Sequence, residues 1–508
     1  MTHFQDVRWN NIKDKLGRMR DSHTFRTWPF PNFPARPAPR QNDNDARHFS
    51  HDGAQDLTTS PRSAASPTHN SRLRNRSMWA HALVLFNVLG IPLSHGPYLE
   101  YYYNTSFPAK SLTSLSLILA LQILCLSSMP IPIGAAHQRL SHSHDSRWRL
   151  LFACAGAVTV AAQLALRWCR TYSLVVLQGP VLGGALGALG TLSMLRLAGH
   201  YRGNVPLVSV QSGAVGFGGA GVYTLVARAF LGSARHEGVW IVNAGMTGGT
   251  LLVAAVLHGR AQPAPVSVGV HFAFPTPMLP PYVHSRRTPR ALLVLALLST
   301  TLTTGPLLTH PLLTPLLLTQ SPSLHPPSTA SLLLTTSHFA AALSASLTAS
   351  TPLLPRLGPL NTFLAATTCC GAVLLGPVLG PRVWLAGVYA VLHGLGFGCV
   401  AASAGAAAAV LLRAAGGRER SEDSARDECA RRAELPARLA LLMSAAGVAA
   451  FAGVVGGAAV LERWGSGGVL LKGAGGMVCV GVGVGLGVGV RIWWWRRGWR
   501  TSEKDISR

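Results

Sequence analysis

Three histidines lie within long stretches of the sequence that carry few charges: His95, His338 and His393. A neutral imidazole is much cheaper to bury in an apolar environment than a lysine or an aspartate, and its pKa lies near physiological pH. These histidines could therefore bind a solute through hydrogen bonds or carry a proton. The alternative for each one is a neutral histidine that is hydrogen-bonded to a neighbouring helix.

Amide side chains occur in similar apolar stretches, at Asn87, Gln163, Gln178, Gln211 and Asn243. An amide both donates and accepts hydrogen bonds, and hydrocarbon offers it no partner. We therefore expect these residues, together with the three histidines, to be candidates for binding a substrate in a central cavity. The alternative is hydrogen bonding between helices, which contributes about 0.6–2 kcal/mol for each pair.

Runs of about 20 apolar residues recur along the chain, and a helix of that length crosses about 30 Å of hydrocarbon. They predict an all-α integral membrane protein with about twelve spanning helices. The predicted spans are residues 80–102, 111–135, 148–166, 172–197, 205–230, 238–258, 289–310, 329–349, 361–380, 383–412, 437–461 and 467–490.

The composition agrees with this interpretation. Only 12% of the 508 residues are charged and 48% are hydrophobic, whereas a soluble domain is about 25% charged. The net charge of +25 would suggest nucleic acid in a soluble protein. Here the charge gathers in the tails and the short connections, so we expect a lipid bilayer around the chain and no nucleic-acid partner.

Basic residues also predict which side each connection faces. Cytoplasmic connections of membrane proteins are enriched in Lys and Arg. If the N-terminus is cytoplasmic, most of the 44 Lys and Arg residues fall on that side. The other side holds eight: Lys110, Arg167, Arg170, Arg228, Arg235, Arg382, Arg463 and Lys472. This bias is expected for an even number of spans.

The spans divide into two groups of six, which is typical of transporters built from pseudo-repeated halves. We predict a disordered, basic cytoplasmic N-terminal tail (1–78) because that stretch has few aliphatic residues. Two six-helix halves (79–258 and 289–490) follow, joined by a Pro-rich cytoplasmic link (259–288), and a basic cytoplasmic tail (491–508) ends the chain.

Glycines recur every three or four residues in the fourth and fifth spans. They include Gly183 and Gly187, and Gly213 and Gly216. This spacing leaves a bare stripe on one helix face, where the backbone of a neighbouring helix can approach closely. We therefore predict that these four glycines pack helices together.

Five segments have a characteristic composition. They are the end of the first span (Pro92–Tyr102), the Gly-rich fourth span (Gln178–Gly190), an aromatic-basic connection (His200–Asn204), the start of the fifth span (Gln211–Gly219) and a short basic turn (Pro355–Asn361). In this order they resemble the monocarboxylate-transporter-like branch of the major facilitator superfamily, particularly its fungal members. The similarity is clearest over residues 85–225 and is weaker beyond them.

The resemblance implies a secondary transporter that moves a small organic solute, such as a monocarboxylate, by alternating access. It also implies a location in the plasma membrane and coupling to protons. The residues that could carry a proton here are His338 and His393, on the argument given above for buried histidines. The sequence departs from the family in the first span, which has no Lys, and in the eighth, which has neither Asp nor Arg. This departure keeps a second interpretation open, a transport-inactive membrane sensor or scaffold derived from such a carrier.

The sequence shows no pattern typical of an enzyme, such as a phosphate-binding loop or a Ser-His-Asp arrangement. His137, His142 and His144 cluster near Asp145, but their spacing matches a metal site only weakly. We therefore expect a small-molecule substrate and no enzymatic activity, cofactor or bound metal ion.

Overall fold

The computed structural model describes ten parts of the chain, all of them within one compact unit, Ala65–Arg508. The described residues are 67–140, 145–200, 205–231, 236–259, 307, 327–351, 356–375, 383–415, 424–464 and 472–486.

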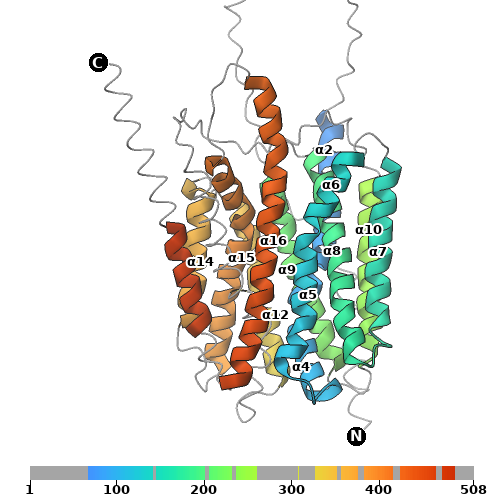
Figure 1. Ribbon diagram of the computed structural model, residues 1–508, viewed down its shortest axis with the longest axis vertical. Helices are drawn as coiled ribbons and strands as arrows, with labels where there is room; N and C mark the ends of the chain where they lie inside the picture. Colours follow the sequence, from blue (N-terminus) through green and yellow to red (C-terminus); the bar gives the residue numbers. More distant parts are fainter. Residues whose placement is uncertain are drawn as a thin grey trace, which may run out of the picture. The chain divides into compact units, whose positions relative to one another are not determined.

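Six spans form the first half of the described chain (Figure 1). The first span is broken into α2 (Pro67–Val88), α3 (Gly90–Leu93), α4 (Gly96–Tyr101) and the π-helical turn η2 (Tyr102–Ser106); the second consists of α5 (Leu112–Ser128) and α6 (Pro130–Leu140); the remaining four are α7 (Asp145–Ala165), α8 (Tyr172–His200), α9 (Val205–Leu231) and α10 (Gly238–Gly259).

Five further helices belong to the second half. They are α12 (Pro327–Ser350), α14 (Pro359–Leu375), α15 (Val383–Ala415), α16 (Ser424–Trp464) and an apolar helix over Lys472–Leu486. Of the twelve predicted spans, eleven coincide with these helices and those of the first half. The remaining one, 289–310, lies outside the described residues apart from Leu307.

Nine of the described helices are long and apolar enough to cross a membrane, and two more, Pro359–Leu375 and Lys472–Leu486, are shorter and apolar. Large apolar side chains also cover the outside of the bundle. Leu150 and Leu252, for example, are 64% and 68% exposed. Such a surface is stable when hydrocarbon surrounds it, so the chain is an all-α integral membrane protein.

Prolines explain why the first two spans are broken. Pro92 and Pro97 cannot donate a backbone hydrogen bond, and the helix ends between them, at Ser94. Pro130 similarly begins α6 directly after α5. In addition, α2 begins at Pro67, so the last residues of the stretch predicted as a disordered tail (1–78) are helical. The helix extends beyond the apolar run, with Arg74 and Arg76 exposed.

Equivalent helices of the two halves pack in the same way. In the first half α8 packs on α5, where a Cβ at Gly183 would overlap the carbonyl oxygen of Gln122. In the second half α15 packs on α12, where a Cβ at Gly398 would overlap the carbonyl oxygen of Ala341. The fourth span therefore approaches the second in one half, and the tenth approaches the eighth in the other, as expected for repeated halves.

Among the described helices, two pairs make most of the contact between the halves. Helix α5 packs on α16, and α9 packs on α12. Figure 1 shows α5 and α16 running side by side along the bundle. We call the end of the bundle that contains α4, the start of α5 and the end of α16 the α4 end.

Candidate functional site

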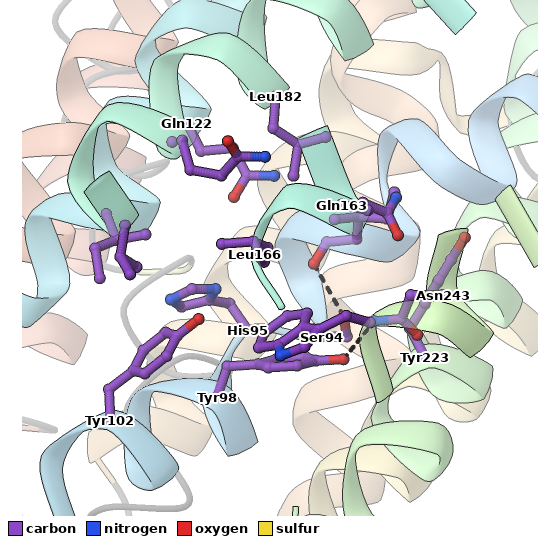
Figure 2. Close-up of a pocket in the computed structure, with 16 residues that line it drawn as sticks. Ser94, His95, Tyr98, Tyr102, Gln122, Gln163, Leu166, Leu182, Tyr223 and Asn243 are labelled. Atoms are coloured by element: carbon purple, nitrogen blue, oxygen red, sulfur yellow. Dashed lines mark hydrogen bonds between the residues drawn. The ribbon is translucent and has the colours of Figure 1, made fainter. Parts of the chain in front are cut away.

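A cavity of about 40 Å³ lies inside the first half, towards the α4 end. Residues from all six spans of that half line it, and Figure 2 shows their side chains. The polar side chains that line it include His95, Tyr98, Gln122, Gln163, Gln178 and Asn243. None of the lining residues is Lys, Arg, Asp or Glu, and most of the lining surface is apolar, so the cavity is uncharged and carries a few polar groups.

A chain of hydrogen bonds fixes one wall of this cavity. Gln163 Nε2 on α7 donates to the hydroxyl of Thr247 on α10 at 2.9 Å. The Tyr223 hydroxyl donates to Asn87 Oδ1 at 2.7 Å and also lies 2.7 Å from the Thr247 hydroxyl. Because the single proton of Tyr223 points to Asn87, Thr247 must donate to Tyr223. Each group donates to the next, from Gln163 to Asn87, and the hydrogen bonds connect four helices: α7, α10, α9 and α2.

Replacing Tyr223 with phenylalanine is expected to lower the free energy of unfolding by about 1–3 kcal/mol, because Asn87 Oδ1 and the Thr247 hydroxyl would lose a buried partner. The measurement is thermal unfolding of the purified protein in detergent. Tyr103→Phe is the matched control. Tyr103 is exposed, so removing its hydroxyl should change the free energy of unfolding by no more than about 0.5 kcal/mol. Equal stability of the two variants would contradict the role of this hydrogen-bond chain.

Four buried polar atoms at the cavity have no hydrogen-bond partner among the residues that the structure describes. They are His95 Nε2, Gln122 Nε2, Gln163 Oε1 and Asn243 Oδ1. The four side chains are at least nine-tenths buried. Buried polar atoms in proteins nearly always have partners, so this concentration at one cavity indicates a place for a hydrogen-bonding molecule.

Aromatic rings form the side of the cavity nearest the α4 end. The Tyr98 ring stacks on Trp240 with 5.2 Å between centroids, and His95 stacks on Tyr98 at 6.1 Å. The Tyr98 hydroxyl also accepts a hydrogen bond from Asn243 Nδ2 at 2.7 Å. These contacts fix the positions of His95 and Asn243, so that both side chains border the cavity.

The structure brings some of the predicted substrate-binding residues together. His95, Gln163, Gln178 and Asn243 all line the cavity. Gln178 Nε2 already donates to the carbonyl of Ala162. Asn87 is one hydrogen bond away, through Tyr223. Gln211 is half-buried on α9 and does not line this cavity.

The other two predicted histidines belong to the second half and lie outside the cavity. His338 is buried and its Nε2–H donates to the carbonyl of Leu93 at 3.1 Å, which is a contact between the halves. His393 is buried between the rings of Tyr389 and Phe397, at 6.1 and 5.9 Å between centroids. The predicted residues therefore form no single group around one cavity.

The predicted packing glycines also differ in their surroundings. A Cβ at Gly183 would overlap Gln122 and one at Gly187 would overlap Leu126, both on α5. A Cβ at Gly216 would lie 2.9 Å from the carbonyl oxygen of Leu85 on α2. At Gly213 it would meet no atom within 4 Å, so this glycine takes no part in the close contact.

Sequence reasoning missed a second polar cluster at the opposite end of the first half. His81 Nδ1 and His258 Nε2 lie 3.0 and 3.1 Å from the hydroxyl of Ser193, and Arg196 donates to the carbonyl of His258 at 3.2 Å. The Arg196 guanidinium lies over the Trp148 ring, 4.7 Å from its centroid. Each residue stands near the end of its apolar run, where a polar side chain is unremarkable in sequence.

The structure adds no metal site. Among the described residues, no group of three or more His, Cys, Asp or Glu side chains could hold a metal ion. His142 and His144 lie outside the described residues, as do the side chains of His137 and Asp145.

Comparisons with known proteins identify the fold. No protein-family model matches the sequence, and no curated protein matches it. The structure of a point mutant of the nucleoside transporter NupG is similar, with a TM-score of 0.55 at 14% identity over 83% of this chain and 99% of that one. The structure of NupG itself gives 0.53 at 15% identity, over 82% of this chain and 98% of that one.

A human transporter is also similar to this chain in structure. The organic anion transporter MFSD10 (TETRAN) is similar in structure with a TM-score of 0.53 at 14% identity, over 82% of this chain and 99% of that one. The helix order, the repeated halves and these likenesses agree. The chain therefore has the major facilitator fold, of which the described residues contain six spans in the first half and five helices in the second.

Proposed function

We propose that the protein is a secondary transporter, which moves a small organic solute across a membrane by alternating access between its two halves. The observation that supports this proposal is the way the halves meet, mainly through the pairs α5–α16 and α9–α12. Each half also has its own close glycine contact, at Gly183 and at Gly398. Two halves that meet mainly along two helix pairs can rock against each other, which is how alternating access works.

Polar contacts join the described parts of the two halves at the α4 end, which the Lys and Arg distribution predicts to face away from the cytoplasm, and again near the other end of α5. There the Ser444 hydroxyl on α16 lies 3.2 Å from the carbonyl oxygen of Ser127. At the α4 end, Glu462 at the end of α16 accepts hydrogen bonds from the hydroxyl and the backbone N–H of Thr113, at 2.7 and 3.2 Å. Further into the bundle His338 donates to Leu93. The contacts of Glu462 and His338 support the proposal that the described arrangement is closed at the α4 end.

The identity of the solute is a further proposal. The resemblance of residues 85–225 to monocarboxylate-transporter-like carriers favours a monocarboxylate, whereas the structurally similar proteins are described as nucleoside and organic anion transporters. The test is uptake into proteoliposomes of labelled lactate, uridine and a larger aromatic acid, compared with protein-free liposomes. Saturable uptake of any of them supports transport. Absence of uptake for every solute would favour the transport-inactive sensor or scaffold instead.

Proton coupling is proposed to use His338. Its hydrogen bond to Leu93 crosses between the halves, so it must break when they separate, and a coupling group needs surroundings that differ between the two states. We expect an inward proton gradient to accelerate uptake by the unmodified protein and to have no effect on His338→Ala. His393→Ala is the comparison, because the described contacts of His393 lie within the second half. Gradient-driven uptake that survives both substitutions would exclude His338 and His393 as the groups that couple transport to protons.

The plasma membrane is proposed as the location on the basis of the family resemblance. Fluorescence microscopy of a tagged chain in its native cells, with a plasma-membrane marker, tests this.

A further inference from the structure

The cavity in the first half has a donor and acceptor pattern that selects one kind of occupant. Two unpaired acceptors, Gln163 Oε1 and Asn243 Oδ1, belong to the same wall. Gln163 is hydrogen-bonded to Thr247, which lies one helical turn after Asn243 on α10. The unpaired donor, Gln122 Nε2, comes from α5 on the other side of the cavity in Figure 2.

From this geometry we infer that the cavity is a binding site for a compact, uncharged primary amide or urea. The NH₂ group would donate to Gln163 Oε1 and Asn243 Oδ1, and the carbonyl oxygen would accept from Gln122 Nε2. His95 Nε2 supplies a further hydrogen-bonding atom at the cavity. The two N–H groups and the carbonyl oxygen of such a ligand match the two unpaired acceptors and the unpaired amide donor in number and kind.

The volume of the cavity and the absence of charged lining residues further restrict the class of ligand. A cavity of about 40 Å³ has room for about three water-sized groups, or a molecule of about four non-hydrogen atoms, at about 10–15 Å³ for each group. A carboxylate of the same size is disfavoured, because the lining contains no Lys or Arg and an unpaired charge is costly to bury. A nucleoside is too large for the cavity in this arrangement.

The site adjoins the interface between the halves. Ser94 and His95, which line the cavity, directly follow Leu93, the residue whose carbonyl meets His338 of the second half. All the residues that line the cavity belong to the first half, so this half alone holds the site and the interface only borders it. The inference deepens the proposed function, and it rests on that function for the claim that the bound amide is transported.

The test is equilibrium binding of radiolabelled acetamide by the purified full-length protein in lipid nanodiscs. Acetone and acetate have the same arrangement of non-hydrogen atoms, but acetone has no N–H donor and acetate carries a charge. We expect unlabelled acetamide to displace the label, and acetone and acetate to compete at least tenfold more weakly. Absence of saturable acetamide binding, or equal competition by acetone, would overturn the inference.

Variants then locate the site. Gln163→Leu and Asn243→Leu should each weaken acetamide binding at least fivefold, because each removes one acceptor. Asn361→Leu is the matched control, since Asn361 is exposed on α14 and bonded to the carbonyl of Leu357, and it should bind as the unmodified protein does. Unchanged binding by both cavity variants would place acetamide elsewhere. If neither variant remains monodisperse, the competition by acetone and acetate decides the question.

Flux measurements separate this inference from the proposed function. Saturable binding of acetamide without uptake of any solute would support the site and contradict transport. Uptake of another solute by a protein that does not bind acetamide would support transport and contradict the site.

Discussion

Replacing Gly183 with valine is expected to destabilise the protein by at least about 3 kcal/mol, in the upper range for inserting atoms into a packed interior. A Cβ at this position would overlap the carbonyl oxygen of Gln122 and lie 2.8 Å from its carbonyl carbon and Cα. These atoms belong to the backbone of α5, so no side-chain rotation can relieve the contact. The two helices would have to separate along their length.

The measurement is the thermal unfolding midpoint in detergent, together with the yield of monodisperse protein. Gly213→Val is the matched control, because Gly213 lies in another helix of the same half and a Cβ there would meet no atom within 4 Å. We expect it to change stability by less than about 1 kcal/mol. Since Gln122 also contributes a cavity atom, Gly183→Val should weaken acetamide binding in any protein that remains folded. Equal stability of the two variants would contradict the packing contact.

The comparison of these glycines shows how far the sequence could predict the fold. Spans could be predicted because the thickness of hydrocarbon imposes both a length and an apolar composition on every crossing helix. The glycine spacing predicted a stripe that contacts a neighbouring helix. It did not predict which glycines of the stripe take part in the contact. Gly213 and Gly216 are three residues apart in the same repeat, and only Gly216 faces α2. The neighbour's direction depends on tertiary packing, which one sequence does not specify.

The candidate site was harder to predict, for a related reason. Asn243 and His95 were recognisable as polar residues in apolar runs, and the structure places both at one cavity. Their connection depends on Tyr98, whose ring stacks on His95 and whose hydroxyl accepts a hydrogen bond from Asn243 across 145 positions of sequence. A tyrosine in an apolar span is indistinguishable from a packing residue until its hydroxyl is placed. Sequence therefore indicated polar groups that needed partners, and the fold determined which ones met.

Joining the two halves at the α4 end is expected to abolish transport. Thr113 on α5 and Glu462 on α16 meet there, with 2.7 Å between the hydroxyl and the carboxylate oxygen. In a Thr113→Cys, Glu462→Cys double variant, a short bifunctional thiol reagent should connect the halves at this point. Alternating access requires the same contact to open once in each cycle, so the linked protein should retain its fold and lose nearly all uptake of whichever solute the unmodified protein carries.

Single variants treated with the same reagent control for the native cysteines, of which Cys154, Cys369 and Cys479 are exposed. They should keep most of their uptake, because the halves meet mainly through the packing of α5 on α16 and of α9 on α12, and the exposed hydrogen bonds from Thr113 to Glu462 are a small part of that contact. A cleavable reagent provides the decisive comparison, since reduction should restore uptake to the level of the untreated double variant. Full uptake by a completely linked protein would mean that the halves do not separate at the α4 end, and alternating access through this interface would be wrong.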